Sequence, residues 1–273
     1  MTRPRLYGGY VLDLDGTVYL DDELLPGADT AITGLRERGA AVVFATNKPL
    51  ETAAQYAAKL TRLGIPTTAD EVVTAADSLI DHLRAEHPGA RLLTIAEDVL
   101  VQRLAGEGFA VTGDPRSADV VVVSFDRTFD YAKLVAAYRA VLEGGAAIVA
   151  TNPDPYCPTA DGGLPDCAAM LAALEACTGH TAEAVLGKPS LRMGRTCLGR
   201  LGVPAADVAV VGDRILTDVA MGKRLGAAGI LVLSGATLEA DVAGSGVTPD
   251  AVLSGIAELV PVGDEDDGSA SPT

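Results

Sequence analysis

Residues 10–17 read YVLDLDGT, and this stretch decides the fold. An apolar run ends here at two aspartates two positions apart, Asp13 and Asp15, and glycine and threonine follow at once. Alternate side chains of an extended strand share one face, so the two carboxylates are predicted to project together where the strand stops. Two negative charges so close need a cation between them, or one must keep its proton. The stretch also fits a strand that ends in an ordinary polar turn, so the rest of the chain must decide.

Two other predicted strands also end in polar residues. The apolar run 40–45 stops at Thr46 and Asn47, and the run 208–211 ends just before Asp213. Ligands of an open parallel sheet bind beyond the carboxyl ends of its strands, where loops from several strands converge. The three strand ends therefore predict one shared site, and carboxylate oxygens there would suit a hard ion such as magnesium.

Apolar periodicity predicts strands and helices in alternation along most of the chain. The predicted strands are 10–14, 40–45, 91–95, 118–124, 146–150, 208–211 and 229–233, and the predicted helices are 28–38, 50–63, 77–86, 97–107, 131–143, 167–177, 189–201, 221–225 and 251–259. This rhythm predicts an α/β fold, with a doubly wound parallel sheet covered by helices on both faces. It restarts near residue 77, which indicates a second α/β unit. The acidic stretch near the C-terminus, residues 262–273, is predicted to be disordered.

Composition limits the classes of function. The chain has 273 residues, 48% of them hydrophobic, which is enough for a substantial core. Its formal net charge of -16 repels nucleic acid and anionic membranes, so neither is expected as a partner. Asp13 and Asp15 interrupt the apolar stretch that would otherwise resemble a signal peptide, and no apolar run is long enough to cross a membrane. We therefore expect a cytoplasmic protein.

Cysteine and histidine usage suggests no further chemistry. The four cysteines form no C-x-x-C pair and have no histidine cluster beside them in the sequence, so they do not predict a zinc site. Reduced thiols are expected in the cytosol. The three histidines, His82, His87 and His180, do not neighbour a candidate serine or cysteine nucleophile, which disfavours histidine-driven nucleophilic catalysis.

Four short motifs, in order, resemble those of the haloacid dehalogenase (HAD) superfamily. They are DLDGT at 13–17, Thr46-Asn47, Lys188-Pro189 and GDRILTD at 212–218. The insertion between the second and third motifs resembles the α/β cap of subfamily IIA, which includes pyridoxal phosphate, phosphoglycolate, glycerol-phosphate and p-nitrophenyl phosphate phosphatases. The resemblance implies a Rossmann-like core domain, residues 1–77 and 183–273, with an inserted cap domain at 78–182.

The resemblance also implies roles for the acidic residues. Asp13 would be the nucleophile that forms an aspartyl-phosphate, and Asp15 the general acid that later becomes the base. Mg²⁺ would be held by the Asp13 carboxylate, the Asp15 backbone carbonyl and Asp213. At ~4 Å and an effective dielectric constant of ~20, each repulsion between unit charges that the ion cancels is worth about 4 kcal/mol.

Other motif residues take supporting roles under the same resemblance. The transferring phosphoryl group would be bound by Gly16, Thr46, Asn47 and Lys188. Asp218 would orient metal-bound water, although it could instead cap the helix that follows. Asn152 and Asp154 are expected to form an Asx turn, with contact to substrate as the alternative.

The expected function is Mg²⁺-dependent hydrolysis of a small phosphorylated metabolite by a monomer or homodimer. Glycerol phosphate, phosphoglycolate, a sugar phosphate and p-nitrophenyl phosphate are the candidate substrates. A phosphotransferase or mutase on the same fold and a non-catalytic metabolite-binding module remain as alternatives. The chain departs from many relatives at Lys48-Pro49, where they carry Asn-Ser, and at Asp166-Cys167, where they often carry glycine and a small residue. These departures leave the substrate open.

Overall fold

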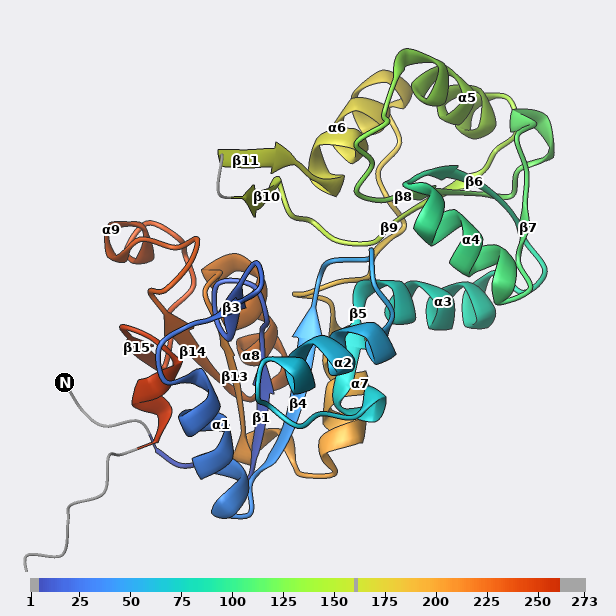
Figure 1. Ribbon diagram of the computed structural model, residues 1–273. Helices are drawn as coiled ribbons and strands as arrows, with labels where there is room; N and C mark the ends of the chain where they lie inside the picture. Colours follow the sequence, from blue (N-terminus) through green and yellow to red (C-terminus); the bar gives the residue numbers. More distant parts are fainter. Residues whose placement is uncertain (1–4, 160–161, 261–273) are drawn as a thin grey trace, which may run out of the picture.

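The computed structural model describes residues 5–159 and 162–260 and shows two α/β units joined by two crossings of the chain (Figure 1). The first crossing lies between Thr74, which ends β5, and Ala75, which begins α3. The second follows Val185 at the end of β12. The predicted disordered tail, residues 262–273, lies outside the described residues.

Six parallel strands form the sheet of the first unit, in the order β15-β14-β13-β1-β4-β5. Their bounds are β1 (Gly9–Leu12), β4 (Ala41–Thr46), β5 (Val72–Thr74), β13 (Val208–Gly212), β14 (Ala228–Val232) and β15 (Ala251–Leu253). Helices α1 (Ala28–Glu37) and α2 (Ala53–Arg62) cover one face, and α7 (Leu191–Leu201) and α8 (Ala220–Leu225) cover the other. The predicted doubly wound fold is therefore confirmed.

Alternation along β1 explains how one strand serves both layers. Tyr10 and Leu12 pack into the cluster beneath α1 and α2, whereas Val11 packs into the cluster beneath α7 and α8. All three side chains are at most 1% exposed. A strand buried on both faces reads as a continuous apolar run, which is why the sequence predicted it.

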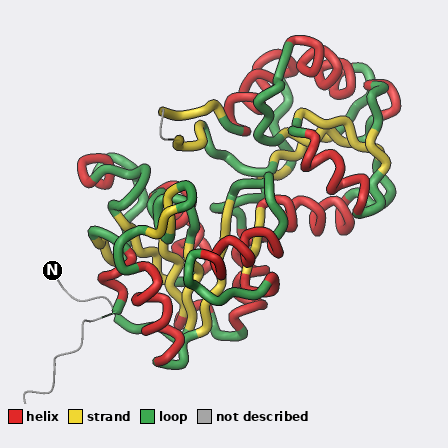
Figure 2. Tube along the Cα trace, viewed as in Figure 1, coloured by secondary structure: helices red, strands yellow, loops and turns green. Residues whose placement is uncertain are grey.

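Five parallel strands form the sheet of the second unit, in the order β12-β9-β8-β6-β7. They are β6 (Arg91–Ile95), β7 (Ala110–Val111), β8 (Val120–Val123), β9 (Ala147–Ala150) and β12 (Ala184–Val185). Helices α3 (Ala75–Glu86) and α4 (Asp98–Gly106) pack on one face, and α5 (Tyr131–Leu142) and α6 (Cys167–Thr178) pack on the other. Because β12 belongs to this sheet, the unit extends beyond the predicted boundary at residue 182. Figure 2 shows the resulting helical layers in red around the yellow strands of both units.

Two antiparallel hairpins and one short helix are the remaining strands and α-helices of the described residues. They are β2 (Tyr19–Leu20) with β3 (Glu23–Leu24), β10 (Tyr156–Thr159) with β11 (Gly162–Pro165), and α9 (Glu239–Val242). The β10–β11 hairpin extends from the second unit towards the first (Figure 1). Arg214 of the first unit donates to the carbonyl oxygen of Tyr156 at 3.0 Å. The hairpin thus helps to cover the carboxyl edge of the first sheet.

The two edge strands of the first sheet correct the sequence-based assignments. The predicted helix 251–259 is wrong, because Ala251–Leu253 form the edge strand β15 and only Ile256–Leu259 form a 3-10 turn. The strand β5 (Val72–Thr74) was not predicted. Both strands have three residues, which is too few to show a period, and pairing with β14 or β4 decides their conformation.

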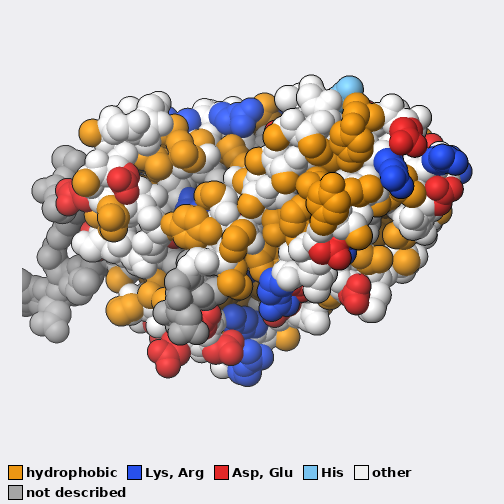
Figure 3. Space-filling view, turned by 90° about the horizontal axis from the view of Figure 1, so that it is seen from above, with side chains coloured by type: hydrophobic (Ala, Val, Ile, Leu, Met, Phe, Trp, Pro, Cys, Tyr) orange, Lys and Arg blue, Asp and Glu red, His pale blue; other side chains and the backbone are white. Residues whose placement is uncertain are grey.

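Surface features agree with the composition. No helix in the described part of the chain is long and apolar enough to cross a membrane. No disulfide joins the four cysteines, all of which lie in the described ranges. On the face shown in Figure 3, apolar side chains gather across the middle and charged side chains of both signs lie mostly towards the rim.

Candidate active site

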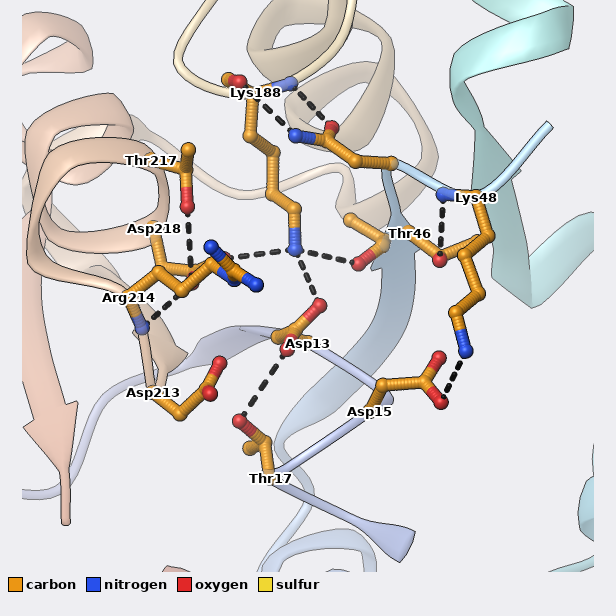
Figure 4. A network of polar contacts seen from close by, with 12 residues as sticks. Asp13, Asp15, Thr17, Thr46, Lys48, Lys188, Asp213, Arg214, Thr217 and Asp218 are labelled. Atoms are coloured by element: carbon orange, nitrogen blue, oxygen red, sulfur yellow. Dashed lines mark hydrogen bonds and ion pairs between the residues drawn. The ribbon is translucent and has the colours of Figure 1, made fainter. Parts of the chain in front are cut away.

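The carboxyl ends of three neighbouring strands bring the predicted site residues together (Figure 4). Asp13 follows β1, Thr46 ends β4 and Asp213 follows β13. These strands lie side by side in the order β13-β1-β4 and run parallel, so their ends meet at one edge of the sheet. Lys188 reaches the same edge from the loop between β12 and α7.

The ammonium group of Lys188 contacts three other groups of this site. Its side chain is 3% exposed, and its Nζ atom contacts Asp13 Oδ1, Asp218 Oδ1 at 2.7 Å and the carbonyl oxygen of Ala45 at 2.9 Å. Burial lowers the pKa of Lys188, but the charges of Asp13 and Asp218 outweigh it and leave the pKa above its usual value. The lysine therefore stays positively charged, buried between two carboxylates, rather than solvated at the surface.

Three carboxylates lie together at this edge, and the Lys188 ammonium contacts two of them, Asp13 and Asp218. Oxygens of Asp13, Asp213 and Asp218 lie within 4.8 Å of one another, and all three residues are buried. Burial, followed by the charges of Asp13 and Asp218, raises the pKa of Asp213, and the charge of Arg214 partly offsets this.

The donor set of this cluster fits a hard divalent cation. Asp213 Oδ2 accepts a hydrogen bond from the Ala236 amide at 2.6 Å, whereas its Oδ1 is buried with no partner among the described residues. An unpartnered buried carboxylate oxygen is costly unless a cation or proton meets it. Carboxylate oxygens are the ligands that Mg²⁺ prefers, so these residues fit the ion that the motifs imply.

Asp218 contacts Lys188 directly, a contact that the sequence did not reveal. Its Oδ2 accepts from the backbone amide of Arg214 at 3.1 Å. The alternative role as a cap of the following helix is wrong, because α8 begins after Val219 with no side-chain cap. Asp218 instead lies in a short π-type turn, Ile215–Val219, that returns its carboxylate towards β1.

Asp15 projects from the strand end into a different environment from that of Asp13. Its Oδ1 accepts from Lys48 Nζ at 2.7 Å, and its Oδ2 is buried without a described partner. Burial raises the pKa of Asp15, and the charge of Lys48 partly offsets this. Lys48 had stood out only as a departure from the family pattern. Its contact with Asp15 spans 33 residues, so no local signal could have found it.

Gly16 packs closely against Asp213, and Thr17 contacts Asp13. Gly16 has φ +82°, and a Cβ atom there would lie 2.7 Å from Asp213 Oδ2, so a larger residue would be strained and would collide. Thr17 Oγ1 donates to Asp13 Oδ2 at 3.4 Å. These contacts orient the carboxylate of Asp13.

Thr46 and Asn47 differ in how their side chains are used. Thr46 Oγ1 accepts from the Lys48 amide at 3.1 Å. Asn47 Oδ1 accepts from the Lys188 amide at 2.7 Å, while Nδ2 donates to Asp154 Oδ2 at 2.9 Å. Asn47 therefore positions the loop that carries Lys188 and joins it to the second unit.

The predicted Asx turn is present, because the Asp154 amide donates to Asn152 Oδ1 at 3.0 Å. Asn152 Nδ2 also donates to the carbonyl oxygen of Asn47 at 3.1 Å. Both residues of the second unit are buried against the first unit, and Asp154 lines the site. Their contacts with Asn47 join the second unit to the first, so they act as a docking point between the units.

Two adjoining cavities open at this edge of the sheet. The smaller, of about 40 Å³, is lined by Asp13, Asp15, Thr46, Asn47, Lys48, Asp154, Tyr156, Cys157, Asp166, Lys188, Arg214, Thr217 and Asp218. The larger, of about 220 Å³, is lined by Asp15, Tyr19, Lys48, Pro49, Leu50, Glu51, Tyr56, Lys59, Phe125, Arg127, Cys157, Leu164 and Asp166. Asp15 and Lys48 line both cavities and so stand at their junction.

Arg214 of the first unit and Asp166 of the second are two of the lining residues that sequence reasoning did not assign to the site. Arg214 packs over the ring of Tyr156 at 4.9 Å and lies 3.9 Å from Asp154 Oδ1. Arg214 belongs to the fourth motif, so its position next to Asp213 in the sequence was an available signal.

Asp166 lines the same cavity from the second unit. Burial raises the pKa of Asp166 to about 6. Arg127, which lines the larger cavity, pairs with Glu97 of the second unit at 2.8 Å.

Comparison with known proteins gives the family. Residues 10–110 match the model of a haloacid dehalogenase-like hydrolase, and residues 185–259 match that of a HAD-hydrolase-like family. The sugar-phosphatase AraL of Bacillus subtilis is 34% identical over 257 residues, which cover 94% of this chain and 93% of AraL. The chain belongs to the haloacid dehalogenase-like hydrolase family. The resemblance to subfamily IIA is thereby confirmed.

Solved structures of the family share the whole fold. The p-nitrophenyl phosphatase from Archaeoglobus fulgidus superimposes with a TM-score of 0.86 at 31% identity and covers 93% of this chain and 98% of its own. The glycerol phosphate phosphatase Rv1692 from Mycobacterium tuberculosis, in complex with magnesium, has a TM-score of 0.83 at 30% identity, covering 93% of this chain and 77% of its own. Both units of this HAD-like hydrolase therefore have counterparts in phosphatase structures.

Proposed function

We propose that this HAD-like hydrolase is a Mg²⁺-dependent phosphatase that hydrolyses small phosphomonoesters through an aspartyl-phosphate on Asp13. One observation carries the proposal: buried Lys188 lies between Asp13 and Asp218 at the base of a cavity, with Asp213 beside them. The names of the relatives support it, since AraL is a sugar-phosphatase and the Archaeoglobus protein a p-nitrophenyl phosphatase.

In the first half-reaction, a carboxylate oxygen of Asp13 bonds to phosphorus while the bond from phosphorus to the ester oxygen breaks. The departing oxygen takes its proton from Asp15, and the alcohol leaves. In the second half-reaction, Asp15 takes a proton from water, whose oxygen bonds to phosphorus. Inorganic phosphate leaves and the carboxylate of Asp13 is regenerated. Asp15 suits this double role because it lines both cavities, beside Asp13 and beside the space for the leaving alcohol.

The metal would be held by the carboxylates of Asp13 and Asp213 and by the backbone carbonyl of Asp15, with Asp218 close enough to contribute. When bound, Mg²⁺ supplies the positive charge that offsets repulsion between the Asp13 carboxylate and an anionic phosphate.

Three kinds of group would hold the phosphoryl oxygens directly: the Lys188 ammonium, the Thr46 hydroxyl and the backbone amides around Gly16. Asn47 would assist them. Lys188 contributes most, because its charge is buried and fixed by three contacts before substrate arrives. Asn47 acts chiefly by positioning Lys188, since both of its side-chain polar atoms are already engaged.

The substrate should be small. The cavity beside Asp15 holds about 220 Å³, less than the ~300–1,000 Å³ typical of pockets for drug-sized ligands. Its lining mixes cations, carboxylates and aromatic rings, which suits a polar leaving group such as glycerol or a sugar. The cap, which we take to be the second unit from α3 to β12, would exclude water from this space.

A phosphate-release assay over a panel of phosphomonoesters tests the proposal. We expect release with Mg²⁺ and a large loss when a chelator removes it. Transfer of phosphate to an added acceptor alcohol, in place of release, would favour a phosphotransferase. Binding of phosphorylated ligands without any release, at any substrate concentration with Mg²⁺ present, would favour a non-catalytic binding module and overturn the proposal.

A further inference from the structure

A second group of potential metal ligands lies away from the active site, in the second unit. His82 belongs to α3, His87 directly follows that helix, and Glu183 directly precedes β12. One ligand atom from each lies within 4.8 Å of the others. We call these three residues the histidine cluster. Glu183 is 96 residues from His87 in the chain, so no local sequence pattern indicates the histidine cluster.

The distances between the potential ligand atoms approach those between the ligands of a bound metal. Glu183 Oε1 lies 3.2 Å from His87 Nε2 and 3.8 Å from His82 Nε2. Zinc bonds to such ligands at about 2.0–2.1 Å, which places neighbouring ligands of a tetrahedral site about 3.3 Å apart. Small side-chain rotations would therefore bring all three atoms around one ion.

His82 is the observation that points to a ligand. The residue is 5% exposed, and its Nε2 atom is buried with no hydrogen-bond partner among the described residues. A buried ring nitrogen without a partner loses the hydrogen bond that it would make in water. The nitrogen faces the carboxylate of Glu183, where a cation would complete its bonding.

Charges around the cluster partly balance one another. Arg192 is close enough for its charge to lower the pKa of His82, but its guanidinium donates to Glu86 Oε1 at 2.9 Å, and the charge of Glu86 acts in the opposite direction. The Glu183 carboxylate lies within 4 Å of both imidazole rings. Its side chain is 46% exposed and that of His87 is 18% exposed, so an ion has a path from solvent to the buried ring of His82.

We propose that the histidine cluster is a binding site for a divalent transition metal of the Zn²⁺ type, with His82, His87 and Glu183 as its three protein ligands. Imidazole nitrogen selects such ions over magnesium, which prefers oxygen ligands. Three protein ligands leave a fourth position for water.

The site joins the two passages of the chain between the units. His82 and His87 belong to the segment that leaves the first unit through α3, and Glu183 belongs to the segment that returns through β12. A bound ion ties these segments together and so stabilises the second unit. This proposal does not depend on the phosphatase proposal, because the cluster lies outside both active-site cavities.

The NMR signals of the three histidine rings provide a direct test. The full chain, isotope-labelled at histidine, is titrated with Zn²⁺ while excess Mg²⁺ occupies the acidic active site. A histidine-to-glutamine variant at each position assigns the signals. We expect the signals of His82 and His87 to change together and to saturate at one equivalent. His180 is exposed and lies outside the cluster, so its signal should stay unchanged.

Variants separate a built site from adventitious binding. Glu183→Gln changes a half-exposed side chain and should keep the fold, yet it should weaken Zn²⁺ binding at least about a hundredfold, the upper range for loss of even an outer partner of a metal ligand. Zn²⁺ should raise the melting temperature of the native chain and of the control His180→Gln, but not that of Glu183→Gln.

Two results would overturn the proposal. One is Zn²⁺ binding that leaves the signals of His82 and His87 unchanged, which would assign the ion to thiols or to the aspartates. The other is equal affinity in Glu183→Gln and in the native chain.

Discussion

Two parallel sheets of the same architecture lie in one chain, and only one carries a reactive edge. In the first sheet, β1 and β13 are followed by Asp13 and Asp213, whose carboxylates converge. In the second sheet, β8 and β9 are followed by Ser124 and Thr151, whose buried hydroxyls bond each other at 3.0 Å. The fold places both pairs at the same kind of position.

The difference between the two edges is one of unsatisfied charge. Ser124 and Thr151 are neutral and partnered, so their strand ends are complete as they stand. The first edge buries three carboxylates, of which two contact the Lys188 ammonium, an arrangement that a further cation would stabilise. A parallel sheet therefore offers a location for a site, and side-chain charge at the strand ends decides whether one exists.

The largest expected effect comes from removing Asp13, the proposed nucleophile, at the charged edge. Asp13→Asn should lower kcat by about 10⁵–10⁶-fold, as for loss of other covalent nucleophiles. The fold should survive, because Asn keeps the shape and Lys188 retains Asp218 as its partner. Steady-state kinetics and circular dichroism check this, and substantial activity in the variant would remove Asp13 from the mechanism.

A smaller effect on activity is expected from replacing Asp213, another aspartate of that edge. Asp213→Asn removes one unit of charge, worth about 4 kcal/mol at ~4 Å, and should weaken Mg²⁺ binding by about 10²–10³-fold. Because burial and neighbouring carboxylates raise the pKa of Asp213, its charged form is penalised at neutral pH. The metal-free variant should therefore melt higher than the metal-free native chain.

Two measurements check the Asp213 prediction. The first is the Mg²⁺ dependence of kcat/KM, which should move to higher concentrations of the ion. The second is thermal melting with a chelator and with Mg²⁺, and an unchanged response to Mg²⁺ would argue against Asp213 as a ligand.

Asp166 lies where the second unit faces the first, and its protonation is expected to make the stability of the chain depend on pH. Burial raises its folded-state pKa to about 6, whereas an unfolded aspartate titrates near ~4. Between these values the folded chain keeps a proton that the unfolded chain releases, so this group lowers stability as pH rises through the interval. Asp166→Asn lacks this loss. Its free energy of unfolding, relative to the native chain, should improve by about 1–3 kcal/mol from pH ~4 to ~7.

Urea unfolding across that pH interval measures the effect of Asp166. Parallel stability curves for the native chain and the variant would show that this carboxyl titrates normally in the fold.

The smallest effect on activity is expected at the neutral edge. Ser124→Ala leaves the buried Thr151 hydroxyl short of a partner and should destabilise the fold by about 1–2 kcal/mol. The value of kcat should stay within about twofold of that of the native chain, because neither residue lines the two active-site cavities. A large loss of kcat at unchanged stability would show that the second edge takes part in chemistry.

Prediction from the sequence succeeded where the signal was local. The buried strands β1, β4 and β13 were evident from apolar runs, and the polar residues after them from their side-chain chemistry. It failed for β5 and β15, whose conformation depends on pairing with strands far away in the chain. It also missed the β10–β11 hairpin, because turn-forming residues suggest a loop whether or not the flanking segments pair.

The amino-acid sequence by itself determined the alternation of strands and helices and the polar groups at the strand ends, since periodicity and side-chain chemistry are properties of neighbouring residues. Only the tertiary structure decided which groups meet: Lys48 with Asp15, Lys188 with Asp218, and Glu183 with the two histidines. Contacts between distant segments depend on sheet order and on how the two units dock, and neither is written in any short stretch of the chain.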